Sequence, residues 1–233
     1  MVGLDRAEDV VQRPPRPSQL LRGVRGYCVV FALVVVSYAL CAVQTSADPS
    51  AAAFLVQLVT VAVTLRVADV PPAAQRAGWL TLAVAGAATI GVAALGSQGL
   101  VLDVVLSAAS AAAFLIAPVA ILAQQFRRRR ADVEALLAAI AAYVMIGMAF
   151  TFVYNLLALL ATSPVFGDGT VDSLTSQLFF SFTTLTTVGY GNLVPVSPGV
   201  QTVAVVEAIT GQLFLVIAIA RILSAPKRKQ VAE

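Results

Sequence analysis

Six apolar stretches of about twenty residues each follow one another along the chain and are separated by short polar segments. A helix of that length can cross roughly 30 Å of hydrocarbon. The composition agrees, because only 12% of the 233 residues are charged, whereas a soluble domain has about 25% charged residues. The sequence therefore predicts an all-α membrane protein with six transmembrane helices, over residues 26–43, 51–70, 78–96, 100–124, 133–160 and 200–224.

A shorter segment, residues 172–184, lies between the fifth and sixth spans. As a helix it would be about 20 Å long, so it can enter a membrane and return but cannot cross it. It leads into five residues that read T-V-G-Y-G, which are Thr187, Val188, Gly189, Tyr190 and Gly191. The two glycines allow backbone dihedrals that other residues avoid, so consecutive carbonyl groups can face one narrow passage. We predict a re-entrant pore helix followed by a filter loop.

The segment resembles the selectivity filter of potassium channels, whose signature T-x-x-T-x-G-Y-G is matched by Thr184, Thr187, Gly189, Tyr190 and Gly191. The resemblance implies that K⁺ is bound by the backbone carbonyls of residues 187–190, with the Thr187 hydroxyl below them, in place of its hydration shell. It also implies that Gly191 turns the chain toward the mouth and that the Tyr190 ring braces the strand against the pore helix. A Thr/Gly-rich loop of a transporter is the alternative for this octapeptide.

One strand of this kind cannot enclose a pore, so the motif implies four identical copies around a symmetry axis. The residues expected to support the filter include Thr184 and Thr186, which precede it. Asn192 departs from the family, because many potassium channels have aspartate directly after G-Y-G, and Thr183 stands where some carry a buried acid. We therefore expect no acid pair at the outer mouth.

Glu207 and Gly211 stand out in the last span. A carboxylate at membrane depth usually faces a partner or water, so we hypothesise that Glu207 bonds to Thr183 or to another hydroxyl of the pore helix. Residues 207–212 resemble the last helix of a prokaryotic group of small potassium channels. Gly211 stands where the family often bends this helix to open an inner gate. The alternative is a small residue that permits close helix contact.

The basic residues predict the orientation. With six spans, all 15 Lys and Arg residues fall on one side of the membrane, whereas the opposite loops carry only Asp48, Asp168 and Asp172. By the positive-inside rule both termini are then cytoplasmic and the filter loop opens outward. We expect a multi-pass protein of the plasma membrane.

The first four spans form a block that resembles the voltage-gated layout without its charges. A voltage sensor needs several arginines at three-residue spacing within its fourth span. Residues 100–124 contain no arginine, and Arg127–Arg130 lie past the span. We therefore expect weak or no voltage dependence. The predicted layout is a cytoplasmic tail (1–20), a four-helix block (21–126), a basic linker (127–134), a pore domain (135–226) and a short cytoplasmic tail (227–233).

The predicted function is passive, selective conduction of K⁺ by a homotetramer in a lipid bilayer. No nucleophile–base pair, phosphate-binding loop or metal-binding cluster indicates an enzyme, and no cofactor besides the permeant ion is expected. The pI near 9.1 does not indicate nucleic-acid binding, because the arginines flank apolar spans. Two alternatives remain open: a pore-loop subunit of a potassium transporter, and a non-conducting membrane subunit.

Overall fold

The computed structural model describes residues 17–45, 51–68, 75–76, 79–80, 83, 86–87, 99–127, 133–167 and 169–223. Its regular elements are α1 (Pro17–Ala42), α2 (Ala51–Val67), α4 (Leu100–Arg127), α5 (Val133–Leu160), α6 (Leu174–Leu185) and α7 (Pro198–Leu223). The described part of the chain contains no strand, so it is all-helical.

Within the described residues, four helices are long and apolar enough to cross a membrane: Val24–Ala42, Leu100–Gln124, Val133–Leu160 and Pro198–Ala218. They correspond to the first, fourth, fifth and sixth predicted spans. The second predicted span appears as a shorter apolar helix, Ala53–Val67. The third, residues 78–96, lies outside the described residues apart from isolated positions. The count of six spans therefore stays a prediction.

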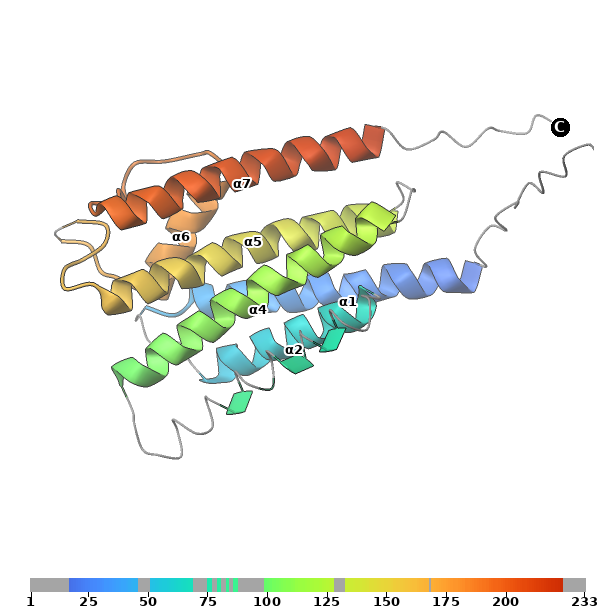
Figure 1. The fold of residues 1–233 in the computed structure, drawn as a ribbon, viewed down its shortest axis with the longest axis horizontal. Helices are drawn as coiled ribbons and strands as arrows, with labels where there is room; N and C mark the ends of the chain where they lie inside the picture. The colour runs from blue at the N-terminus through green and yellow to red at the C-terminus, as the bar shows by residue number, and fades with distance from the viewer. Residues whose placement is uncertain are drawn as a thin grey trace, which may run out of the picture.

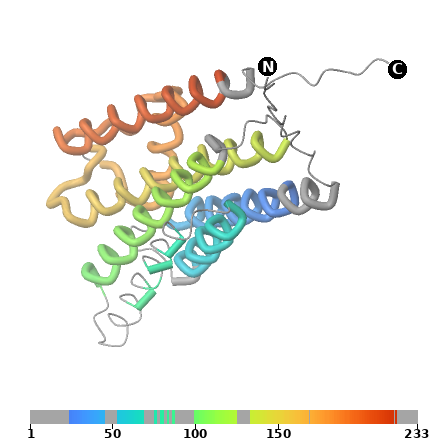
Figure 2. Tube along the Cα trace, turned by 45° about the vertical axis from the view of Figure 1, so that its right-hand side comes forward, coloured from blue at the N-terminus to red at the C-terminus, as the bar shows by residue number. Residues whose placement is uncertain are grey.

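The long helices run side by side as a bundle (Figure 1). Helices α4 and α5 pack along each other in opposite directions, and α1 lies against both α2 and α5. The short α6 contacts α5 on one side and α7 on the other, and its N-terminal end reaches α1. Figure 2 shows the same layering, with α7 and α6 forming one side of the molecule and α1 and α2 the other.

Helix α1 begins earlier than the first predicted span. Helix α1 begins at Pro17, so it includes the last residues of the predicted tail. The density of prolines there predicts an irregular segment, but a proline fits the first helical position, where its missing N–H would have no partner in any case. Helix α5 has the bounds of the fifth predicted span, and residues 128–132 connect it to α4. Those five residues lie outside the described part.

Polar side chains inside the bundle pair with one another between helices. Ser37 of α1 lies 3.2 Å from Thr60 of α2, between their hydroxyl oxygens. Ser110 of α4 donates to the Gln57 side chain of α2 at 2.7 Å. Bonds of this kind join helices in lipid, where a buried polar group has few other partners. They hold α1, α2 and α4 together as one block.

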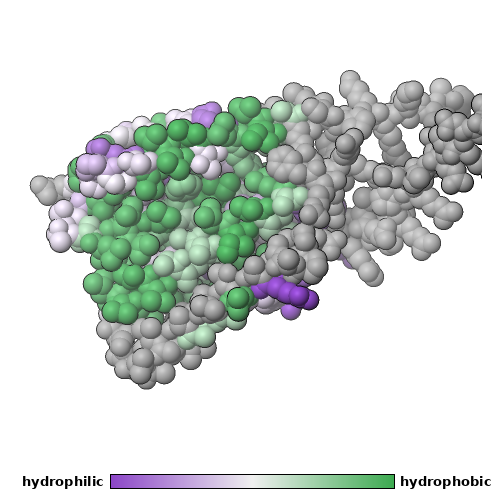
Figure 3. Space-filling model, in the orientation of Figure 1, coloured by the Kyte–Doolittle hydropathy of each residue, from purple (hydrophilic) through white to green (hydrophobic). Residues whose placement is uncertain are grey.

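The described residues on the face shown in Figure 3 are apolar over much of their area. Large side chains such as Leu115 of α4, Ile140 of α5 and Ile209 of α7 are exposed. Soluble monomers rarely expose apolar patches beyond a few hundred Å². The surface is that of a membrane protein, in agreement with the lengths of the helices.

Candidate ion-conducting filter

The pore helix α6 starts at a defined cap. Ser173 is the N-cap residue, and its hydroxyl oxygen accepts the Ser176 N–H at 3.1 Å. Both Asp172 and Ser173 are of residue types that can cap a helix. Asp172 instead accepts the backbone N–H of Val165 at 3.2 Å, which ties the start of α6 to the loop after α5. The position of α6 is therefore fixed on its N-terminal side by two separate bonds.

The backbone of the filter segment alternates in the sign of φ. Thr187, Gly189 and Gly191 have φ values of 61°, 53° and 78°, whereas Val188 and Tyr190 do not have positive φ. Successive residues of opposite handedness can orient their backbone N–H groups toward one side. Their carbonyl groups can then form a row on the other side. Positive φ is rare for a β-branched residue such as Thr187, and conformations of this kind cluster at functional sites.

Two backbone bonds attach the filter to the end of α6. The Thr187 N–H donates to Thr184 O at 3.0 Å, and the Gly189 N–H donates to Thr183 O at 3.1 Å. The hydroxyl of Thr186 bonds back to Phe182 O at 2.6 Å. The filter segment is thus a direct continuation of the pore helix, and a shift of α6 would move it.

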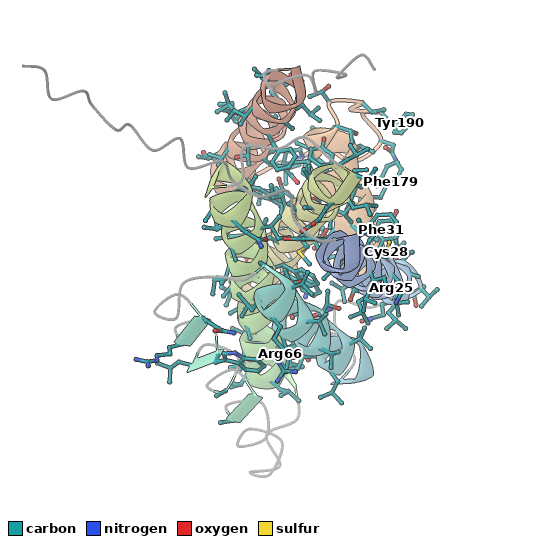
Figure 4. All side chains as sticks on the ribbon, turned by 90° about the vertical axis from the view of Figure 1, so that its right-hand side faces the viewer. Arg25, Cys28, Phe31, Arg66, Phe179 and Tyr190 are labelled. Atoms are coloured by element: carbon teal, nitrogen blue, oxygen red, sulfur yellow. The ribbon has the colours of Figure 1, made fainter. Side chains whose placement is uncertain are left out.

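The Tyr190 ring packs on the pore helix. It stacks on the Phe179 ring with a centroid distance of 5.7 Å and an interplanar angle of 14°, and both residues lie on the same side of the molecule (Figure 4). The ring is therefore in contact with the pore helix, and its bracing role stays a prediction. Asn192, two residues further on, is exposed.

Glu207 lies behind the pore helix, fully buried. Its two carboxyl oxygens contact two hydroxyls: Tyr154 Oη donates to Oε2 at 2.6 Å, and Ser181 Oγ lies 2.5 Å from Oε1. Of the two alternatives left by the sequence, the pore-helix partner is Ser181 and not Thr183, whose hydroxyl bonds within α6 to Phe180 O at 3.0 Å. Glu207 therefore links α7 to both α5 and α6.

Tyr154 is a partner that the sequence did not indicate. It is separated from Glu207 by 53 positions and is fully buried in α5. A buried tyrosine hydroxyl usually has a hydrogen-bond partner, and this general rule is the one indication that the sequence offers for Tyr154. That rule does not say which residue the partner is.

Gly211 lies against the C-terminal end of the pore helix. A Cβ built on Gly211 would come 2.3 Å from Leu185 O. The same carbonyl accepts the Tyr143 hydroxyl at 3.1 Å. Of the two readings that the sequence left open, this geometry favours the small residue that permits close helix contact.

Gln212 is a second residue that the sequence analysis did not indicate, and it contacts the filter itself. The amide Nε2 of Gln212 lies 3.5 Å from Thr187 Oγ1. The filter residues 187–191 and Gln212 are all exposed on the single chain. Exposed backbone at membrane depth persists only where protein or a water-filled cavity surrounds it, so this face is suited to lie toward an aqueous passage.

Comparison with known proteins agrees with the filter motif. Residues 139–228 match a family model described as "Ion channel". Over 62 residues the chain is 40% identical to the inward rectifier potassium channel Kirbac3.1 of Paramagnetospirillum magnetotacticum, a match that covers 27% of this chain and 21% of that protein. The chain therefore spans about a fifth of that relative. No solved structure matches the chain.

The chain is thus similar to an ion-channel family over residues 139–228 and to a potassium channel over 62 residues. The resemblance stated from the T-x-x-T-x-G-Y-G motif is confirmed. Together with the four long apolar helices, the two matches support an ion channel in a membrane.

Proposed function

We propose that the chain forms a homotetrameric channel that conducts K⁺ selectively and passively, with the carbonyls of Thr187, Val188, Gly189 and Tyr190 as ion sites. The observation that carries this proposal is the alternating sign of φ from Thr187 to Gly191. This alternation allows four consecutive carbonyls to face one axis. Rings of such carbonyls replace the hydration shell of K⁺.

The exposure of the filter on a single chain supports its assembly with further copies. Val188 and Tyr190 are 52% and 71% exposed on one chain, and their backbone groups would meet lipid if the chain were alone. A tetramer would enclose these groups around water and ions. The same assembly would place Gln212 beneath the filter, beside the Thr187 hydroxyl.

The experiment is an uptake assay with the purified full chain in liposomes, using Rb⁺ as the tracer for K⁺. We expect uptake that is driven by a K⁺ gradient, blocked by Ba²⁺ and small for Na⁺. Gly189→Ala should abolish it, because φ at residue 189 is 53° and an L-residue in the left-handed region is strained by about 1–2 kcal/mol, in each of four subunits.

Gly199→Ala is the matched control. Gly199 has no positive φ, and a Cβ added there meets no atom within 4 Å, so its uptake should equal that of the unsubstituted chain. Equal uptake by the Gly189→Ala and Gly199→Ala variants would contradict the filter assignment. Absence of any uptake would favour a non-conducting subunit, and uptake that depends on a coupled ion would favour a transporter.

A further inference from the structure

Five oxygen atoms from four residues form a row behind the pore helix, across three helices. Tyr154 Oη of α5 lies 2.6 Å from Glu207 Oε2 of α7. Glu207 Oε1 lies 2.5 Å from Ser181 Oγ of α6. Ser181 Oγ also lies 2.8 Å from the backbone carbonyl oxygen of Gly147 in α5. The row therefore contains three oxygen–oxygen contacts at hydrogen-bond distance.

Each of these contacts needs one hydrogen between its oxygens. The hydroxyls of Tyr154 and Ser181 supply one hydrogen each, whereas a carbonyl and an ionised carboxylate supply none. With Glu207 ionised, the Ser181 hydrogen can point to Glu207 or to Gly147 but not to both. One pair of oxygens would then face each other without a hydrogen, at 2.5 or 2.8 Å.

The Gly147 carbonyl also accepts the Thr151 hydroxyl at 2.8 Å. That second donor satisfies the carbonyl, but it does not remove the close approach of Ser181 Oγ. The argument for a hydrogen between Ser181 Oγ and Gly147 O therefore rests on the short distance between these two oxygens. It does not rest on the Gly147 carbonyl lacking a donor.

A protonated Glu207 supplies the missing hydrogen. Its Oε1–H can donate to Ser181 Oγ, the Ser181 hydroxyl can donate to Gly147 O, and the Tyr154 hydroxyl donates to Oε2. All three contacts then contain one hydrogen each. We propose that Glu207 is held as a neutral carboxylic acid in this row, and that the row positions the pore helix against α5 and α7.

Within the described part of the chain, no cationic side chain pairs with Glu207 to balance a negative charge. The titratable groups that face it are two tyrosines of α5, Tyr154 in direct contact and Tyr143 farther away. The group that faces it from α6 is the Ser181 hydroxyl, and no Lys or Arg of the described residues pairs with it. Its side chain has no solvent exposure. A buried charge without an ion partner is costly, whereas a neutral acid with both oxygens bonded is satisfied.

The protonation state of Glu207 does not depend on the proposed function. The role of the row in positioning α6 does rest on the proposed function, because α6 carries the filter. Infrared difference spectroscopy of the intact tetramer in lipid separates the two. At neutral pH, the spectrum of the unsubstituted chain minus that of Glu207→Gln should contain the C=O band of a protonated carboxyl group, shifted in deuterated water. A carboxylate band in its place would overturn the proposal.

The variants test the positioning role. Glu207→Gln keeps one donor and one acceptor in the neutral shape, so the stability of the tetramer and the K⁺/Na⁺ selectivity should change by less than about twofold. Glu207→Leu removes both, and because a lost buried hydrogen bond costs about 1–3 kcal/mol, selectivity or tetramer yield should fall roughly tenfold or more, 1.4 kcal/mol being a factor of ten.

Two further variants keep the test decisive if Glu207→Leu does not assemble. Tyr154→Phe and Ser181→Ala each remove one contact, and the loss in both should be intermediate between Glu207→Gln and Glu207→Leu. If Glu207→Gln is damaged as severely as Glu207→Leu, the positioning role assigned to the neutral acid is wrong. If the unsubstituted chain fails to conduct K⁺ while the protonated band is present, the proposed function fails and the protonation state stands.

Discussion

Gly211 of α7 contacts Leu185 of α6 where the pore helix passes into the filter. The position that a Cβ of residue 211 would occupy lies against the Leu185 carbonyl oxygen. A Cβ at this position would be 2.3 Å from that oxygen. The Leu185 oxygen belongs to the backbone and not to the end of a flexible side chain. Either α7 or the end of α6 must therefore move to accommodate a Cβ at position 211. The residue at position 211 thus controls how closely the inner helix approaches the base of the filter.

Gly211→Ala should destabilise the tetramer and impair K⁺ selectivity. Overpacking a well-packed contact costs about 1–3 kcal/mol, and the displaced atom directly precedes the filter. Thermal denaturation of the tetramer and the K⁺/Na⁺ flux ratio measure the two effects. Gly199→Ala, which adds a Cβ in open space, should change neither. A hinge role would predict a different result, namely altered channel opening with unchanged stability and selectivity.

Thr175→Val should weaken the attachment of α1 to the pore helix. The Thr175 hydroxyl oxygen lies 2.8 Å from Gln44 O, just after α1, and 3.1 Å from Ala42 O, at its last residue, so its hydrogen can be donated to either carbonyl. Valine keeps the shape but leaves these carbonyls without that donor, at a cost of about 1–3 kcal/mol. Hydrogen exchange of residues 38–44 should increase.

The matched control for this prediction is Thr202→Val in α7, because the Thr202 hydroxyl bonds within its own helix to Pro198 O at 2.8 Å. Exchange in residues 38–44 should be unchanged in that variant. Equal protection of the end of α1 in the Thr175→Val chain and in the unsubstituted chain would show that the bond does not hold α1 in place.

The contribution of Asp172 to stability should depend on pH. Burial raises the pKa of its carboxyl group above the ordinary value of 3.8, although the Val165 N–H opposes the shift. Because the folded state binds this proton more tightly than the unfolded state, the stabilisation is complete below pH 3.8 and is lost as pH rises through the folded pKa.

Asp172→Asn removes this titration. Melting temperatures of the tetramer, measured for both chains from pH 3.5 upward, should show that the unsubstituted chain loses stability relative to the variant as pH rises. A difference between the two chains that does not change with pH would contradict the pKa shift.

Conductance should depend only weakly on voltage. Helix α4 carries no Lys or Arg before Arg127, its last residue, and moving one elementary charge through the field is worth about 2.3 kcal/mol per 100 mV. Without such charges the helix has no strong response to the field. Recording single channels in bilayers over a range of voltages tests this. A steep conductance–voltage relation that requires several gating charges would be incompatible with it.

Local features of the pore domain could be predicted from the sequence. The cap at Ser173 and the start of α7 at Pro198, with Ser197 accepting the Val200 N–H at 3.4 Å, follow from residue types that favour these positions. The T-V-G-Y-G motif marks the segment of alternating φ because glycine permits positive φ. Thr187 adopts it as well, which its own preferences oppose.

Contacts between distant residues could not be predicted in this way. The bond from Thr175 to Gln44 joins residues 131 positions apart, and Tyr154 meets Glu207 from another helix. In a membrane helix nearly every position is apolar, so the pattern of hydrophobic residues does not reveal which face contacts a neighbour. The few polar residues indicate that a partner exists, but the packing of the helices determines which residue it is.

The central claim is that main-chain carbonyls of the filter select K⁺ over Na⁺. It is tested most directly by the reversal potential of the purified channel in a planar bilayer with K⁺ on one side and Na⁺ on the other. We expect a reversal potential far from zero, with the sign of K⁺ selectivity, that collapses in Gly189→Ala and persists in Gly199→Ala. A reversal potential near zero for the unsubstituted chain would contradict the account.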